Sequence, residues 1–163
     1  MTTKELFMQT WKNEAIITQR VLNAVPNAML DYRPDPRSRT ALELAIHNSI
    51  HSQMLLGLLE KGEMGSGITP PAGLSEAQQG FSAMLPKIEK QLRAMDDKTW
   101  EGKSGKLIGA GGKVMMSAPY VTLAWLSLLD MVHHRGQLAT YLRPMGGKVP
   151  SIYGASADEP GKM

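Results

Sequence analysis

The sequence predicts an all-α protein, a four-helix bundle that forms a single domain over residues 1–163. Apolar residues recur at helical spacing in four long segments, and capping-box sequences precede two of these segments. No segment alternates apolar and polar residues over the length of a strand, and no internal repeat is present. Four amphipathic helices that must bury their apolar faces most simply pack against one another as a bundle.

The first two helices have clear beginnings and ends. Thr2 with Glu5 forms a capping box that opens a helix predicted to run to 25–26, where a proline ends it. Residues 31–39 contain two prolines and predict a loop. Thr40 with Glu43 forms a second capping box, and the helix it opens is predicted to end at Gly62.

The second half of the chain has longer connections, after helices two and three. A third helix is predicted from Ser75 to about Met95, with Pro86 expected to kink it or split it. The glycine-rich segment 96–117 is either a long loop or a small β-hairpin. The fourth helix, from Ser117 to about Arg143, has nine apolar residues among the twelve at 121–132, which predicts burial nearly all round. An irregular C-terminal tail follows it.

Composition excludes several classes of site and partner. The chain has no cysteine, so disulfides, thiolate metal sites and cysteine nucleophiles are excluded, and any metal ligands must be His, Asp or Glu. The chain has eighteen Lys and Arg residues and fifteen Asp and Glu residues, and aromatic residues make up only 6%. No nucleic-acid partner is therefore expected. The longest apolar run is too short to span a bilayer, so no membrane partner is expected, and the protein is expected in the cytoplasm.

Histidines occupy apolar positions on the second helix. The residues of its inward stripe are spaced three and four apart, at Leu44, His47, His51, Met54 and Leu58. His47 and His51, four residues apart, lie on one face and can reach one ion or one water. Each histidine could also be a core residue that donates to a backbone carbonyl.

The fourth helix carries a matching pair, Asp130 and His134, again four residues apart. Its stripe comprises Leu123, Leu126, Asp130, His134, Gln137 and Tyr141. A carboxylate within an apolar helix is costly to bury unless a cation, a metal or hydrogen-bond donors match it. If the two helices are neighbours, His47, Asp130 and His134 converge on a divalent metal, with His51 as a fourth ligand or a supporting partner.

Alternatives to this metal site remain open at the sequence level. Asp130 could form a buried ion pair with Arg135, Arg143 or a histidine. His133 is expected at the surface or supporting the site rather than binding metal. A lysine cluster between 98 and 113 is expected to be a solvated loop or the entrance for an anionic substrate.

Two segments together resemble the DinB/YfiT-like family: RTALELAIHNSIH at 39–51 and DMVHHRGQLATYLRPMGGKVPSIYG at 130–154. The resemblance implies a four-helix bundle, often dimeric, in which three histidines hold a divalent metal, commonly zinc or nickel. By position, His47 and His134 match two of these ligands. Asp130 stands where the family has the third histidine, and two histidines with a carboxylate suit manganese or iron(II) about as well as zinc.

These observations lead to two functional hypotheses. The first is a metal-dependent enzyme that activates a bound water or thiolate, either a thiol-dependent transferase or a hydrolase, acting on a small molecule. Gln137 and Tyr141 would orient the substrate or the metal ligands. The low-molecular-weight thiol and the homodimer are implied by the resemblance alone. The second hypothesis is a non-catalytic metal-binding or stress-response protein that binds a small molecule.

Overall fold

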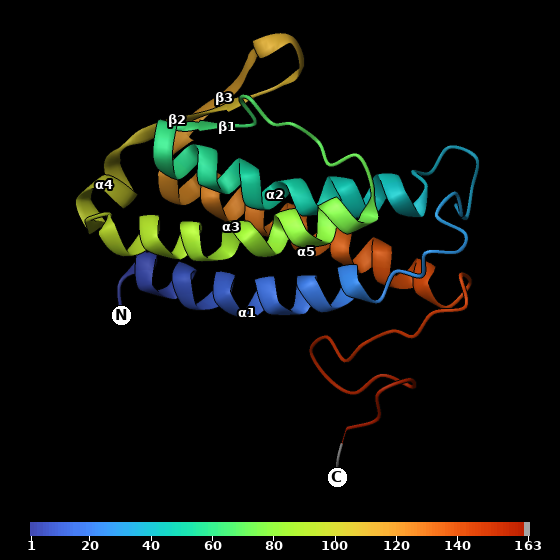
Figure 1. The fold of residues 1–163 in the computed structure, drawn as a ribbon. Helices are drawn as coiled ribbons and strands as arrows, with labels where there is room; N and C mark the ends of the chain where they lie inside the picture. Colours follow the sequence, from blue (N-terminus) through green and yellow to red (C-terminus); the bar gives the residue numbers. More distant parts are fainter. Residues whose placement is uncertain (162–163) are drawn as a thin grey trace.

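The computed structural model describes residues 1–161, which form a four-helix bundle with a small sheet at one end (Figure 1). The four long helices are α1 (Thr3–Asn23), α2 (Ala41–Lys61), α3 (Leu74–Ala94) and α5 (Tyr120–Leu142). In the ring that they form, α1 and α2 each pack against α3 and against α5. The bundle prediction is thereby confirmed, and α2 and α5 are direct neighbours.

Both predicted capping boxes are present. The Thr2 hydroxyl accepts from the backbone N–H of Glu5, and the Glu5 carboxylate accepts from the backbone N–H of Thr2. Thr40 and Glu43 form the same reciprocal pair at the start of α2. Gly62 ends α2 with a φ of 76°, in the left-handed region that glycine adopts without steric cost.

The third helix differs from its prediction at the start and in the middle. It begins at Leu74 after Gly73 rather than at Ser75, and the N-cap side chain makes no hydrogen bond. Instead, the Glu76 carboxylate accepts from the backbone N–H of Ala72 at 2.9 Å. The expected split at Pro86 is wrong, because α3 is one continuous helix with Pro86 exposed inside it.

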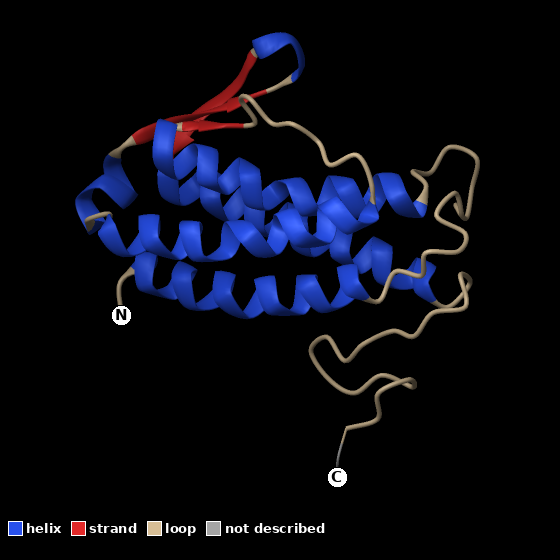
Figure 2. Cartoon of the chain, viewed as in Figure 1, coloured by secondary structure: helices blue, strands red, loops and turns tan. Residues whose placement is uncertain are grey.

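A three-stranded sheet at one end of the bundle makes the all-α prediction wrong in that region (Figure 2). After the short helix α4 (Asp97–Gly102), β2 (Ser104–Ile108) and β3 (Val114–Pro119) form an antiparallel hairpin around the 3-10 turn η1 (Ala110–Gly112). The two-residue strand β1 (Glu63–Met64) adds to β2 in parallel. Of the two alternatives for 96–117, the hairpin is therefore correct, and the last helix begins after β3 instead of at Ser117.

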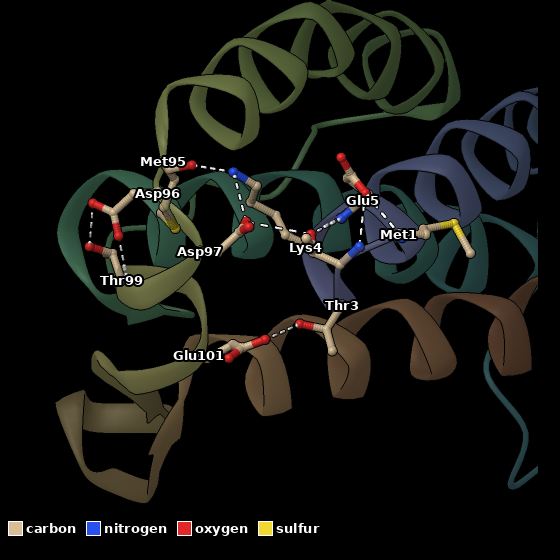
Figure 3. A network of polar contacts seen from close by, with 10 residues as sticks. Met1, Thr3, Lys4, Glu5, Met95, Asp96, Asp97, Thr99 and Glu101 are labelled. Carbon is tan, nitrogen blue, oxygen red and sulfur yellow. Dashed lines mark hydrogen bonds and ion pairs between the residues drawn. The ribbon is translucent and has the colours of Figure 1, made fainter.

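The first turn of α1 is tied to α4 by polar contacts (Figure 3). The Lys4 ammonium donates to the Met95 carbonyl and lies 3.2 Å from the Asp97 carboxylate. Thr3 donates to Glu101 at 2.9 Å. These contacts fix the end of the bundle from which the hairpin projects.

The C-terminal tail is irregular, as predicted, and charged groups hold it against the bundle. Arg143 pairs with Asp158 at 2.9 Å, and Arg20 pairs with Glu159 at 2.5 Å. Tyr153 reaches the buried Arg135, whose guanidinium donates to the tyrosine hydroxyl at 2.6 Å. The tail therefore joins α1 and α5 from outside.

Helix α5 is less buried than its composition predicted. Leu126 is 40% exposed and Leu129 is 61% exposed, so the expectation of burial nearly all round is wrong. The reason is geometric, because α5 has packed neighbours on only part of its circumference. Within residues 1–161, no helix combines the length and apolar character needed to cross a membrane.

Candidate metal centre

Four side chains from α2 and α5 meet at the seam between these helices. His47 and His51 come from α2, and Asp130 and His134 come from α5. Each pair is four residues apart, which places both members on one face of their helix. One ligating atom from each residue lies within 4.8 Å of the other three, so the four groups can share one ion.

The cluster lies at the side of the bundle and has a buried wall and an open one. His51 is 1% exposed and His134 is 9% exposed, whereas the Asp130 side chain is 46% exposed. The expectation that Asp130 is buried among apolar residues is therefore wrong. Its position on α5 faces the seam with α2 from the solvent side, where a carboxylate remains hydrated.

Asp130 lies between two histidines. Its Oδ2 is 3.5 Å from Nε2 of His51, and its Oδ1 is 3.4 Å from Nε2 of His134. The ring of His47 crosses that of His134 nearly at right angles, with 4.3 Å between the centroids. The carboxylate thus faces a ring nitrogen of one histidine on each helix.

Burial keeps two of the imidazoles neutral. It lowers the pKa of His47 to about 4, and the positive charge of Arg39 contributes to the shift. Burial also lowers the pKa of His51 to about 4, against the opposing effect of the Asp130 carboxylate. A divalent metal requires neutral imidazoles, so these ring nitrogens are available as ligands at neutral pH.

The donor set therefore fits a divalent cation. Both ring nitrogens of His51 are buried without a hydrogen-bond partner within the described chain. A buried polar atom without a partner is costly, and a metal ion or the carboxylate of a metal ligand would satisfy it. Two or three imidazoles with one carboxylate suit zinc, manganese or iron(II).

Gln137 supports the cluster through His134. The Nδ1 atom of His134 lies 2.8 Å from Oε1 of Gln137, and Nε2 of Gln137 lies 3.1 Å from Nε2 of His133. Because an amide nitrogen donates and an amide oxygen accepts, this chain makes His134 protonated on Nδ1 and leaves its Nε2 free to bind. The sequence predicted a role for Gln137 here but did not identify its link to His133.

The two arginines proposed as partners of Asp130, and Tyr141, make contacts elsewhere in the structure. Arg135 pairs with Glu14 at 2.6 Å and Arg143 pairs with Asp158, so the ion pairs proposed between Asp130 and these arginines are wrong. Tyr141 is not among the four clustered residues, and its hydroxyl donates to the backbone carbonyl of Arg39 at 3.3 Å.

The lysine cluster lies far from these residues along the bundle. The hairpin adjoins Tyr120 at the start of α5, fourteen residues before His134. At 1.5 Å of rise per residue this is roughly 21 Å along the helix, and Asp130, ten residues after Tyr120, lies roughly 15 Å along it. The hairpin and the four clustered residues are thus separated along the bundle, and a role of the lysines at an entrance for an anionic substrate stays a prediction.

Comparison with known proteins shows the family of the chain. A model of the DinB family matches residues 1–161. The chain belongs to the DinB family. No match is found among curated proteins.

Solved structures of DinB-like proteins share the fold. One from Bacillus cereus is 21% identical, with a TM-score of 0.69 over 91% of this chain and 97% of that chain. One from Bacillus subtilis is 17% identical, with a TM-score of 0.67 over 89% of this chain and 95% of that chain. At these identities the comparison shows a common fold and nothing finer.

Proposed function

We propose that this DinB-family protein binds one divalent metal ion through His47, Asp130 and His134 and acts there on a small electrophilic molecule. The observation that carries the proposal is the meeting of ligating atoms from two helices within 4.8 Å of one another. The family resemblance favours zinc or nickel, whereas the carboxylate makes manganese or iron(II) equally suitable.

In this proposal, His51 orients the carboxylate of Asp130. The two oxygens of Asp130 face different histidines, at 3.4 Å for His134 and 3.5 Å for His51. A neutral His51 that donates to Oδ2 would orient the carboxylate and leave Oδ1 for the ion. Three protein ligands leave a coordination position for water or substrate, which is the arrangement of catalytic sites.

The reaction class favoured by the family resemblance is thiol-dependent transfer, with hydrolysis as the variant that uses water. When bound, the metal ion supplies Lewis acidity and lowers the pKa of a thiol or water. In the transfer, the thiol sulfur forms a bond to the electrophilic carbon, the leaving group departs with its electron pair, and the thiol proton passes to solvent. The half-exposed Asp130 lies on the side from which small molecules would approach.

A non-catalytic binding protein is the second candidate, and the burial of His51 favours it. His51 is 1% exposed, and neither of its ring nitrogens has a hydrogen-bond partner within residues 1–161. If His51 were a fourth ligand, the ion would have a closed tetrahedral shell, as in structural zinc sites. Such a site would serve metal binding, or the capture of a small molecule in a stress response, without turnover.

Elemental analysis of untagged protein incubated with zinc, nickel or manganese tests the metal site. Wild type is expected to hold about one ion per chain, and His47→Ala and Asp130→Ala are expected to lose it. His133→Ala is the matched control, because this histidine is exposed and outside the four-residue cluster. Wild-type protein without metal under all three conditions would refute the proposal.

A second variant separates the two candidate functions. His51→Gln retains an N–H donor toward Asp130, so the ion is expected to remain if His51 only supports the carboxylate. Loss of the ion in His51→Gln would make His51 a ligand and favour the non-catalytic protein. Metal-dependent consumption of a cellular thiol with an electrophile such as a chlorinated nitrobenzene would then establish transfer, and its absence with every thiol would reject that reaction.

A further inference from the structure

The segment 103–119, which comprises the C-cap residue of α4 and the hairpin formed by β2, η1 and β3, has a net charge equal to that of the whole chain. Residues 103–119 include Lys103, Lys106 and Lys113 and no acidic residue. Of the 18 basic and 15 acidic residues in the chain, the remainder is therefore balanced at 15 of each. All three lysines are exposed, and Lys106 and Lys113 lie on the hairpin that projects from the end of the bundle (Figure 1).

Three consecutive apolar side chains on the same hairpin face solvent. Val114 is 48% exposed, Met115 is 62% exposed and Met116 is 43% exposed. Scattered apolar residues are ordinary on protein surfaces, but a run of three on the same hairpin as the exposed Lys106 and Lys113 is not. Basic residues combined with exposed apolar side chains are the features by which peripheral proteins contact anionic membranes.

The edge of β3 that does not pair with β2 carries two features that oppose the addition of a partner strand. Strand β3 pairs only with β2 in the order β1-β2-β3, so its other edge is free within the described sheet (Figure 2). The register with β2 is broken between Leu107 and Ile108, and the strand ends at Pro119, which has no N–H to donate. Bulges and prolines are the devices that prevent edge pairing in natural sheets. An extended peptide or a second copy is thus disfavoured, whereas a lipid surface requires no register.

The structure assigns to this hairpin a contact with an anionic lipid surface. Lys106 and Lys113 would lie beside headgroup phosphates, and the three apolar side chains would enter the interfacial layer. The Lys103 ammonium lies 5.1 Å from the centroid of the Tyr120 ring, at the base of the hairpin. This contact is peripheral and independent of the metal centre. The sequence predicts no membrane partner because the longest apolar run is too short to span a bilayer. A peripheral contact does not require a spanning segment, so the proposal differs from that expectation.

Sedimentation of the full-length protein with lipid vesicles tests the assignment. The probes are vesicles of phosphatidylcholine alone and vesicles in which about one third of the lipid is phosphatidylglycerol, at about 0.05 M and about 0.5 M salt. The protein is expected to sediment with the anionic vesicles at low salt and to be released at high salt. Neutral vesicles are expected to leave it in the supernatant.

Paired variants locate the contact on the hairpin. A lysine near an anionic surface contributes about fivefold to partitioning, so Lys106→Gln with Lys113→Gln is expected to weaken it about 25-fold. The control is Lys12→Gln with Lys148→Gln, which removes the same charge from exposed positions outside the hairpin. Met115→Ser with Met116→Ser is also expected to weaken binding, whereas Met29→Ser, at a residue 50% exposed elsewhere, should not.

Three outcomes would overturn the assignment. The first is wild-type protein that does not sediment with anionic vesicles at low salt. The second is an equal loss in the Lys12 and Lys148 control, which would make the effect one of overall charge. The third is binding of poly-glutamate, as a model of an acidic protein segment, without binding of vesicles.

Discussion

At the scale of single residues, the protonation state of the clustered histidines is the property on which the candidate site depends. His47 and His51 stay neutral because burial lowers the pKa of each to about 4. Gln137 fixes the third histidine, since its amide oxygen lies 2.8 Å from Nδ1 of His134. The site therefore presents ring nitrogens as acceptors without prior binding of an ion.

Replacing Gln137 with leucine is expected to weaken zinc binding about 10- to 100-fold. The change removes the acceptor for Nδ1 of His134, so the ring can rotate or adopt the other tautomer. Titration calorimetry against a competing chelator measures the affinity. Thr140→Ala, an exposed residue three positions later on α5, should bind zinc as wild type does. Equal affinity in Gln137→Leu would show that Gln137 does not orient the ring.

The metal-free protein is expected to lose stability as the pH falls from about 6.5 to about 4. Over this range the unfolded chain, with ordinary histidine pKa values near 6.5, binds protons that the folded His47 and His51 do not bind. The free energy of unfolding therefore decreases with decreasing pH and levels off below about 4 for these groups. Urea unfolding in the presence of a chelator measures the slope. His51→Asn should flatten it, and an unchanged slope would contradict the assigned burial effect.

At the scale of elements, a buried ion pair joins α1, α5 and the C-terminal tail. Arg135 is 1% exposed and donates to the Glu14 carboxylate at 2.6 Å, and Tyr153 donates to the same carboxylate at 2.8 Å. Arg135 also follows the clustered His134 directly in the chain. This contact holds α5 against α1.

Glu14→Gln is expected to destabilise the protein by about 3–5 kcal/mol, because it leaves the buried Arg135 charge without its partner. Chemical denaturation followed by circular dichroism measures the loss. Glu89→Gln is the matched control, since it breaks an exposed pair with Arg93 that should contribute little. Replacing both members, Glu14→Leu with Arg135→Met, should recover most of the stability. If Glu14→Gln costs no more than Glu89→Gln, the pair has no structural role.

At the scale of the whole molecule, the two ends of the bundle have different properties. The hairpin projects at one end, and the C-terminal tail leaves α5 at the other (Figure 1). The His and Asp cluster lies on the α2 and α5 side between them. A substrate at the cluster and a surface at the hairpin would therefore not compete for the same space.

The homodimer stays a prediction, implied by the family resemblance. Light scattering of the purified protein is expected to give the mass of two chains. The measurement should be repeated over a tenfold range of concentration, because weak association shifts with concentration. The mass of one chain at every concentration would contradict it.

The sequence by itself determined the local structure of the bundle. The capping boxes at Thr2 and Thr40 are satisfied by neighbours three residues away, so they are readable without the fold. The spacing of four that places His47 beside His51, and Asp130 beside His134, follows equally from the geometry of one helix. Pro86 shows the limit of such local rules, because the helix around it remains continuous when its neighbours hold it.

Only the tertiary structure decided how these local pieces meet. The alignment of α2 with α5 depends on the packing of all four helices, and no spacing within one helix fixes it. That packing gave Arg135 and Arg143 other acidic partners and left Asp130 half exposed. Helical periodicity records which residues share a face, whereas neighbouring elements determine whether that face meets solvent, another charge or a metal ion.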